Sequence, residues 1–125
     1  MSASALSTLS IDDLLRAYVA AATGHESALD TANPKEADRH NRRAGTIFNE
    51  LVRREMQHQL LVLLEHNCPM VRLFAAADAL KFAPDVAVPV LERLEKDNTG
   101  IASLDAKIHL QMWRQKGRRS KRLTH

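Results

Sequence analysis

Apolar residues recur three or four positions apart along most of this chain, which is helical spacing. Asn33-Pro34 marks one helix start, because asparagine caps a helix and proline fits its first turn. Gly24 is expected to weaken or end the first helix and Lys116-Gly117 to end the last. No segment shows the alternation of a strand. The pattern predicts about six helices, over residues 11–22, 34–54, 56–65, 70–81, 85–96 and 101–115.

The composition favours helices packed closely on one another. Hydrophobic residues make up 45% of the 125 residues, aromatic residues only 4%, and glycine and proline number four each. The apolar content is mostly alanine, leucine and valine, which suits thin helices better than a β-sandwich. We therefore expect an all-α fold in a single domain. The domain would span residues 10–116, between a flexible N-terminus, 1–9, and a basic, flexible C-terminal tail, 117–125.

The predicted helix 34–54 has two contrasting faces. At about 100° per residue, one side is apolar and holds Ala37, His40, Ala44, Ile47, Phe48 and Leu51. The opposite side holds Arg39, Arg42, Arg43, Arg53 and Arg54. Glu50 lies three and four residues before the last two of these arginines, so part of the charge is paired locally. We interpret the arginines as a solvated face; the alternative is a surface that contacts phosphates or a partner.

The formal net charge of +3 comes from the C-terminal tail. Five of the 18 Lys and Arg residues lie in the last ten positions, KGRRSKRLTH, without any acid, which leaves 13 basic and 15 acidic residues elsewhere. Arg118, Arg119, Lys121 and Arg122 are therefore candidate contacts to phosphate or to a partner, with strong salt dependence. Such a tail can equally serve solubility alone. No aromatic residue interleaves these arginines, so stacking on single-stranded bases is not indicated.

The sequence lacks motifs for a metal, a cofactor or a membrane. A single cysteine forms no internal disulfide, and the six histidines include neither an i, i+4 pair nor an HExxH motif. The four glycines are scattered, so no phosphate-binding loop is present. The N-terminus lacks a signal-peptide pattern, and no run approaches the roughly 18 apolar residues of a membrane span. We therefore expect a cytoplasmic protein without metal, cofactor or membrane partner; its oligomeric state is not indicated.

A shift of 30 residues brings part of the sequence onto itself. Each copy consists of a helix, a short Asn/Asp turn and a second helix. A fixed period of this length in a helical chain is typical of stacked helical hairpins. The matched pairs include Leu61 with Leu91, Leu64 with Leu94, Asn67 with Asp97, Val71 with Ile101, Phe74 with Leu104, Ala76 with Ala106, and Leu80 with Leu110.

Residues 60–80, LLVLLEHNCPMVRLFAAADAL, resemble a HEAT repeat. The resemblance lies in leucines on a first helix, an Asn/Asp-x-Pro turn, then Val-Arg and an alanine-rich face on a second helix. More closely, VRLFAAADALKFAPDVAVPVLERLE is similar to a small bacterial family known only as domain of unknown function number 2019. The resemblance covers about residues 35–115, although Gly100 and Ala102 replace Met70 and Arg72 in the second copy. It implies stacked antiparallel hairpins in a HEAT-like or ARM-like α-α superhelix, and it carries no activity.

The stretch HNCPMVR raises the question of a Cys/His chemical site. A nucleophilic Cys68 would need a nearby base and a depressed pKa, which a histidine adjacent in sequence does not guarantee. The same residues suit a helix corner, because Asn67 can cap or turn the chain and Pro69 fits the first helical position. The HEAT resemblance implies that Arg72 pairs with an acid or a carbonyl of a neighbouring hairpin. We favour the corner and assign no catalytic residue.

Asp78 interrupts an Ala/Leu helix close to its packed side. Buried carboxylates need a partner, so we expect it to bond to the next hairpin's turn or to an arginine. The alternative is that Asp78 meets a ligand in a groove.

Two functions are compatible with these features. The first is a non-enzymatic domain that binds another protein, because stacked helical hairpins expose an extended surface. An immunity protein encoded beside a bacterial toxin would be one form of it. The alternative is nucleic-acid binding through the arginine face of helix 34–54 and the basic tail, although the rest of the chain is slightly acidic.

Overall fold

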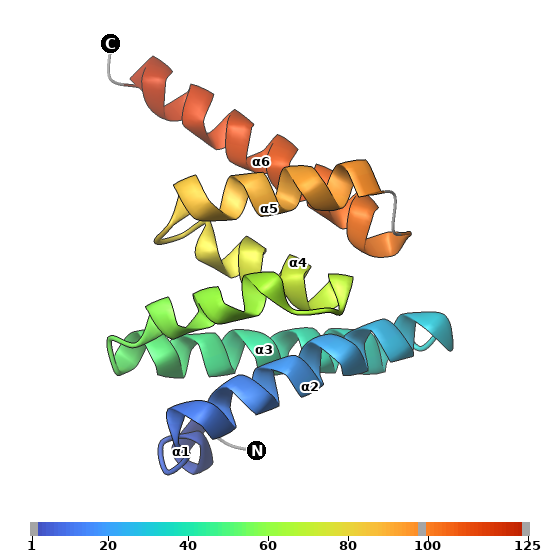
Figure 1. The fold of residues 1–125 in the computed structure, drawn as a ribbon, viewed down its shortest axis with the longest axis vertical. Helices are drawn as coiled ribbons and strands as arrows, with labels where there is room; N and C mark the ends of the chain where they lie inside the picture. The colour runs from blue at the N-terminus through green and yellow to red at the C-terminus, as the bar shows by residue number, and fades with distance from the viewer. Residues whose placement is uncertain (1–2, 98–99, 124–125) are drawn as a thin grey trace.

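The computed structural model describes residues 3–97 and 100–123, with side chains placed for 5–97 and 100–117. Over these residues the protein consists of helices and connecting turns without any strand, which confirms the all-α prediction (Figure 1). None of these helices is both long enough and apolar enough to cross a bilayer. The elements are α1 (Ala3–Leu6), α2 (Ile11–Asp30), α3 (Pro34–Arg53), the 3-10 helix η1 (Gln57–Glu65), α4 (Pro69–Ala79), α5 (Pro84–Asp97) and α6 (Ile101–Leu123).

Consecutive helices pack in antiparallel pairs, with α2 on α3, η1 on α4 and α5 on α6. The pairs are stacked along the longest axis of the molecule, with α1 at one end and α6 at the other (Figure 1). α4 is the central helix, because it also contacts α2, α5 and α6. One hydrophobic core therefore runs through the whole stack.

The core combines small and large apolar side chains. Alanines of α2 and α4, such as Ala22 and Ala76, are fully buried and allow the helices to approach closely. The apolar face predicted for helix 34–54 is buried as expected, with His40 half-buried at its edge. The large side chains that are at most 1% exposed are Leu14, Tyr18, Ile47, Leu51, Leu60, Met70, Val71, Leu91, Leu94 and Leu110.

Gly24 lies inside α2, which continues to Asp30, so the predicted end near residue 22 is wrong. The glycine instead provides space for α3. A Cβ atom on Gly24 would lie only 2.6 Å from Cε1 of His40, so the imidazole rests directly on bare backbone. The predicted start of α3 is confirmed, because the Asn33 side chain accepts a hydrogen bond from the Glu36 amide.

The N-terminal segment, predicted to be flexible over residues 1–9, packs against α3 over its described residues. Leu6 is only 2% exposed and belongs to the core. The guanidinium of Arg54 donates hydrogen bonds to the carbonyl oxygens of Leu6, Ser7 and Leu9, at 2.9, 3.1 and 2.7 Å. Positions 1 and 2 of this segment lie outside the described residues.

The segment predicted as a helix over residues 56–65 is helical, but it forms a 3-10 helix. α3 closes at Glu55, whose φ of 57° turns the chain, and Pro69 begins α4 a short distance later. The tighter i to i+3 bonding spans this interval with few residues. Leu60 and Leu64 still reach the core, while Val62 is 66% exposed.

α6 continues through Gly117 to Leu123, so the predicted end of the last helix at Lys116-Gly117 is wrong. Glycine inside a helix costs about 1 kcal/mol relative to alanine, which neighbours of good helix propensity can offset. Lysines and arginines also suit a helix C-terminus, because the helix dipole favours positive charge there. The backbone of Arg118, Arg119, Lys121 and Arg122 is part of α6; their side chains, and residues 124 and 125, lie outside the described part.

Candidate functional site

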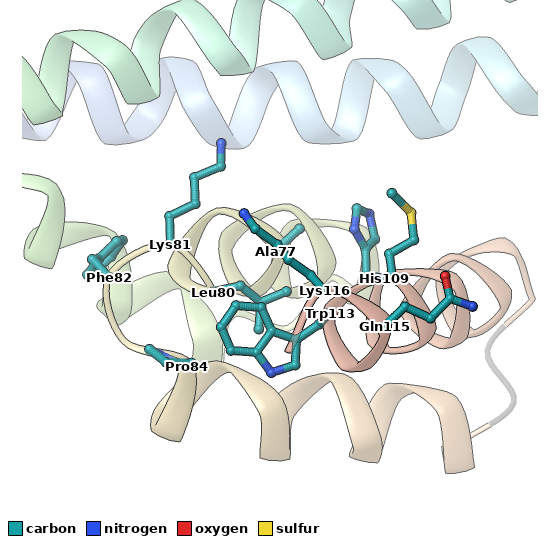
Figure 2. A pocket seen from close by; sticks show the side chains of 10 residues that line it. Ala77, Leu80, Lys81, Phe82, Pro84, His109, Trp113, Gln115 and Lys116 are labelled. Atoms are coloured by element: carbon teal, nitrogen blue, oxygen red, sulfur yellow. The ribbon is translucent and has the colours of Figure 1, made fainter. Parts of the chain in front are cut away.

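A groove of about 860 Å³ opens between α6 and the corner that joins α4 to α5 (Figure 2). Its apolar walls are formed by Ala77 of α4, Leu80 and Phe82 of the corner, Pro84 at the start of α5, and Met112 and Trp113 of α6. The remaining lining residues are Lys81, His109, Gln115 and Lys116. No Asp or Glu is among the described residues that line the groove, so its surface is apolar with a basic edge.

Contacts with α3 hold the corner that forms one wall of the groove. The rings of Phe48 and Phe82 stack with centroids 6.2 Å apart. Nζ of Lys81 lies 5.0 Å from the centre of the Phe48 ring and 3.4 Å from Oδ1 of Asp78. A cation above an aromatic face is attracted to it. The Lys81 amine is therefore kept beside α3, and Figure 2 shows its side chain pointing away from the groove.

An exposed apolar stripe on α6 continues from the groove. Ile101, Leu104, Ile108 and Met112 are three or four residues apart and therefore share one side of the helix. Their exposed fractions are 45%, 59%, 43% and 62% in that order. Met112 belongs to both the stripe and the groove, so the two form one continuous surface, which we call the α6 surface.

The two copies of the 30-residue period differ at this stripe. Leu80 and its match Leu110 are both buried. Ile101 and Leu104, however, match Val71, which is fully buried, and Phe74, whose ring contacts Tyr18 of α2. α2 covers this face of α4, whereas no described helix covers the same face of α6. Covering apolar area yields about 25 cal/mol per Å², so the stripe can gain free energy from a partner.

A second cleft, of about 450 Å³, is lined in part by His25, Asp78, Asp105 and His109. The buried Tyr18 hydroxyl donates a 2.6 Å hydrogen bond to Oδ2 of Asp78, and Lys81 approaches the other oxygen. Desolvation raises the pKa of Asp78 above its ordinary 3.8, against the smaller opposing effects of Tyr18 and Lys81. Asp78 thus bonds to a tyrosine of α2 and to Lys81 of the corner between α4 and α5, and the predicted partner, the next hairpin's turn or an arginine, is wrong.

The stretch HNCPMVR forms the corner between η1 and α4. The backbone amide of Cys68 donates a 3.0 Å hydrogen bond to Nδ1 of His66, so this imidazole nitrogen serves the turn. Pro69 is the first residue of α4, as predicted. Asn67, predicted to cap or turn the chain, lies in the bend, while Cys68 occupies the capping position of α4. The predicted pair of Arg72 with an acid or a carbonyl is not found among the described residues, where its buried Nε has no hydrogen-bond partner.

Most of the five arginines predicted as contacts on helix 34–54 are paired with acids of the same segment. Arg39 lies 2.7 Å from Glu36, and Arg42 lies 3.1 Å from Asp38. Arg43 has no such partner in the described part of the chain. A pocket of about 350 Å³ gathers these three arginines with Leu6, His40 and Thr46. The structure therefore brings three of the five predicted arginines together.

The other two arginines hold the protein itself together. Arg53 and Arg54 both bond to Glu50, whose side chain is 7% exposed. These hydrogen bonds lower the pKa of Glu50 from 4.5 to about 2. Arg54 also binds the N-terminal carbonyls, and its side chain is only 19% exposed. Arg54 is therefore not free to contact a partner.

The described residues contain no group of three or more His, Cys, Asp or Glu side chains that could hold a metal ion. Neither the α6 surface nor the second cleft thus offers a metal centre within that part of the chain. What the groove offers is an apolar surface large enough for several side chains of a partner.

Comparison with known proteins supports the fold without adding a function. No protein-family model and no curated protein matches this sequence. Among solved structures, the protein RPA1889 from Rhodopseudomonas palustris is similar, with a TM-score of 0.84 and 25% identity. The similarity covers 88% of this chain and 93% of that one. The name of that protein states no activity. The similarity therefore shows only that this chain shares its all-α fold, over most of its length, with a protein of known structure.

Proposed function

We propose that this chain is a non-enzymatic, cytoplasmic, HEAT-like helical domain that binds a segment of another protein on its α6 surface. One observation carries the proposal: apolar side chains stay exposed along α6 from Ile101 to Met112 and lead into the groove at Trp113. Contiguous apolar patches with polar rims mark interaction sites, because monomeric soluble proteins rarely leave them uncovered.

The stacked pairs support the HEAT-like part of the proposal. η1 with α4 and α5 with α6 follow the 30-residue period, and each pair contacts its neighbour. Arrays of this kind bury a thin core between hairpins and use their outer surfaces for binding. An immunity protein that covers a toxin remains one specific form of this function.

The chemistry of the polar residues supports a non-enzymatic function. A nucleophile needs a base within hydrogen-bond reach and a group that orients the base. Nδ1 of His66 accepts from the Cys68 backbone amide, and Tyr18 and Asp78 bond to each other. The groove itself is lined by apolar and basic side chains.

Nucleic-acid binding is the second candidate, favoured by the pocket that gathers Arg39, Arg42 and Arg43. Two of these arginines are already paired, which weakens the attraction for phosphate. The test measures the electrophoretic mobility of a nucleic-acid duplex at low salt, first with the natural protein and then with the variant Arg43→Glu. A salt-sensitive shift that the substitution removes would favour this candidate, and unchanged mobility would reject it.

The protein-binding proposal is tested by affinity capture from a lysate of the source organism, with three baits. They are the natural protein, the double variant Leu104→Glu with Met112→Glu, and the control Val62→Glu. All three positions are apolar and more than half exposed, so none of the substitutions should unfold the protein. We expect one protein that binds the natural chain and the control but not the double variant. Equal capture by all three baits would contradict the proposal.

A further inference from the structure

The charge around the α6 surface indicates the chemistry of the segment that binds there, if the proposed function holds. We propose that this segment is an acidic amphipathic α-helix of about three turns, with its apolar side on the stripe and its carboxylates near Lys116.

The first argument is charge. The sequence of α6 holds seven Lys and Arg residues and one acid, Asp105. Asp105 lies four residues after Ile101 and three before Ile108, on the stripe side of α6, but it lines the second cleft and is not among the residues of the groove. Arg114 is paired with Glu92 at 3.3 Å, but no carboxylate lies within ion-pair distance of Lys116 in the described structure. An unpaired cation beside an apolar groove favours a partner that places a carboxylate there.

Figure 2 shows how Lys116 is placed for such a contact. Its side chain extends from α6 toward α4, above the groove that Trp113 and Leu80 line. Lys81, the other lysine of the lining, is already engaged by Phe48 and Asp78. Lys116 is therefore the lysine of the groove that is free to receive a carboxylate, at the edge of the apolar surface.

The second argument concerns backbone hydrogen bonds, which decide between a helical and an extended partner. One wall of the groove is α6, and the other is the end of α4 with the corner at residues 80–83. The corner amides of Lys81, Phe82 and Ala83 donate to carbonyls of α4, and neither wall offers a strand edge among the described residues. An extended segment laid into this groove would lose water from its N–H and C=O groups and find no strand edge to replace it. Each buried group left unpaired costs about 1–3 kcal/mol. A helix satisfies its own backbone, so it is the form that fits.

The third argument is length. The stripe from Ile101 to Met112 spans eleven residue steps of one helix, or about 16 Å at 1.5 Å per residue. A partner helix lying along it would present apolar side chains over about three turns. The open groove at Met112 and Trp113 would then take the bulkiest of these side chains.

The test uses three synthetic peptides of about 18 residues, long enough to exceed the stripe. They share their leucine positions and carry glutamate, glutamine or lysine at every polar position. Trp113 is the only tryptophan of the chain and lines the groove, so its emission reports binding of peptides without aromatic residues. Each peptide is titrated into the natural protein, Lys116→Glu and the control Lys35→Glu, at low and at high salt. Lys35 is exposed in the first turn of α3, where glutamate suits the helix dipole.

We expect the glutamate peptide to bind the natural protein and Lys35→Glu about tenfold more tightly than the glutamine peptide, which is about 1.4 kcal/mol. The lysine peptide should bind most weakly. High salt and Lys116→Glu should both reduce the preference for glutamate. Equal binding of all three peptides would overturn the acidic partner while leaving the proposed protein-binding function intact.

Three further outcomes would also overturn the inference. One is that the glutamate peptide causes no change in Trp113 emission. In that case the affinity capture described above still tests the proposed protein-binding function independently. Another is a dimer in sedimentation that Met112→Glu dissociates, because the surface would then be occupied by a second copy. The last is a duplex that displaces the glutamate peptide, which would assign the basic helix to nucleic acid.

Discussion

Tyr18 and Asp78 form a 2.6 Å hydrogen bond that joins α2 to α4 across 60 residues of sequence. Tyr18 has no exposed surface, and its ring also makes an edge contact with Phe74 of α4, with centroids 6.4 Å apart. Burial of the hydroxyl, together with the Asp78 charge, raises the pKa of Tyr18 well above its ordinary 10.0. This pair thus links the first helical hairpin to the centre of the stack.

Replacing Tyr18 with phenylalanine should destabilise the protein by about 1–3 kcal/mol, because Asp78 loses a donor and stays mostly buried. Urea denaturation would measure the change. The double variant Tyr18→Phe with Asp78→Leu should recover part of the loss, since no carboxylate oxygen is then left without the hydrogen bond that Tyr18 donates. If Tyr18→Phe is as stable as the natural protein, the hydrogen bond contributes nothing.

The ionisation of Tyr18 should be coupled to unfolding. It is the single tyrosine of the chain, so the ultraviolet absorbance of tyrosinate reports on it alone. The pKa is raised in the folded state, so the folded protein keeps the proton that the unfolded chain releases near pH 10.0. Stability from this group is therefore complete below that pH and is lost as pH rises above it. Absorbance and circular dichroism should change together on alkaline titration, and tyrosinate that appears in folded protein would contradict this.

The two helical glycines Gly24 and Gly45 should respond in opposite ways to alanine. A Cβ atom at Gly24 would meet the His40 ring at 2.6 Å, whereas nothing lies within 4 Å of one at Gly45. Gly45→Ala should stabilise the protein by about 0.5–1 kcal/mol through helix propensity alone. Gly24→Ala should destabilise it, and adding His40→Ala should relieve the clash. Thermal unfolding of the four proteins would decide, and equal effects at both glycines would exclude the close approach.

Local signals predicted the helices where local forces decide. Asn33-Pro34 and the apolar face placed α3 within one residue of its observed end at Arg53, because a cap and a buried stripe act together there. The predicted helix ends at Gly24 and Gly117 are wrong for a common reason: glycine ends a helix only where no other interaction favours its continuation. At Gly24 the deciding contact comes from His40 on another helix, which periodicity does not reveal.

The α6 surface could not be predicted from spacing, because an apolar stripe has the same pattern whether it is covered or not. Ile101 and Leu104 matched Val71 and Phe74 in the repeat, yet they are exposed. Whether such side chains are buried depends on whether another helix packs against them in the fold. Arg72 shows the converse case. The resemblance to HEAT repeats implied a partner for it, but no hydrogen bond reaches its buried Nε in the described structure.

Arg54 should act as the residue that holds the N-terminal segment on α3. Arg54→Ala removes its hydrogen bonds to the carbonyls of Leu6, Ser7 and Leu9, and should cost about 1.5–3 kcal/mol, the range for a bond to a charged group. Amide exchange in residues 5–10 should accelerate, while α4 to α6 should be unaffected. The control Arg53→Ala removes an arginine that is 62% exposed and pairs with the same Glu50, so it should cost less than about 1 kcal/mol. Identical exchange in both variants would exclude this role.

Glu50 should make the protein sensitive to acid. Its pKa is lowered in the folded state from 4.5 to about 2, so its contribution to stability is complete above 4.5 and is lost as pH falls toward 2. The contribution of Asp78 to stability has the opposite sign, because its raised pKa makes the folded state less stable as pH rises above 3.8. Comparing the natural protein with Glu50→Gln separates the two groups, since Asp78 is present in both. The difference in their free energies of unfolding should shrink between about pH 5 and pH 2 in urea titrations. A difference that stays constant over that range would mean that the arginine pair does not hold the Glu50 charge in the folded state.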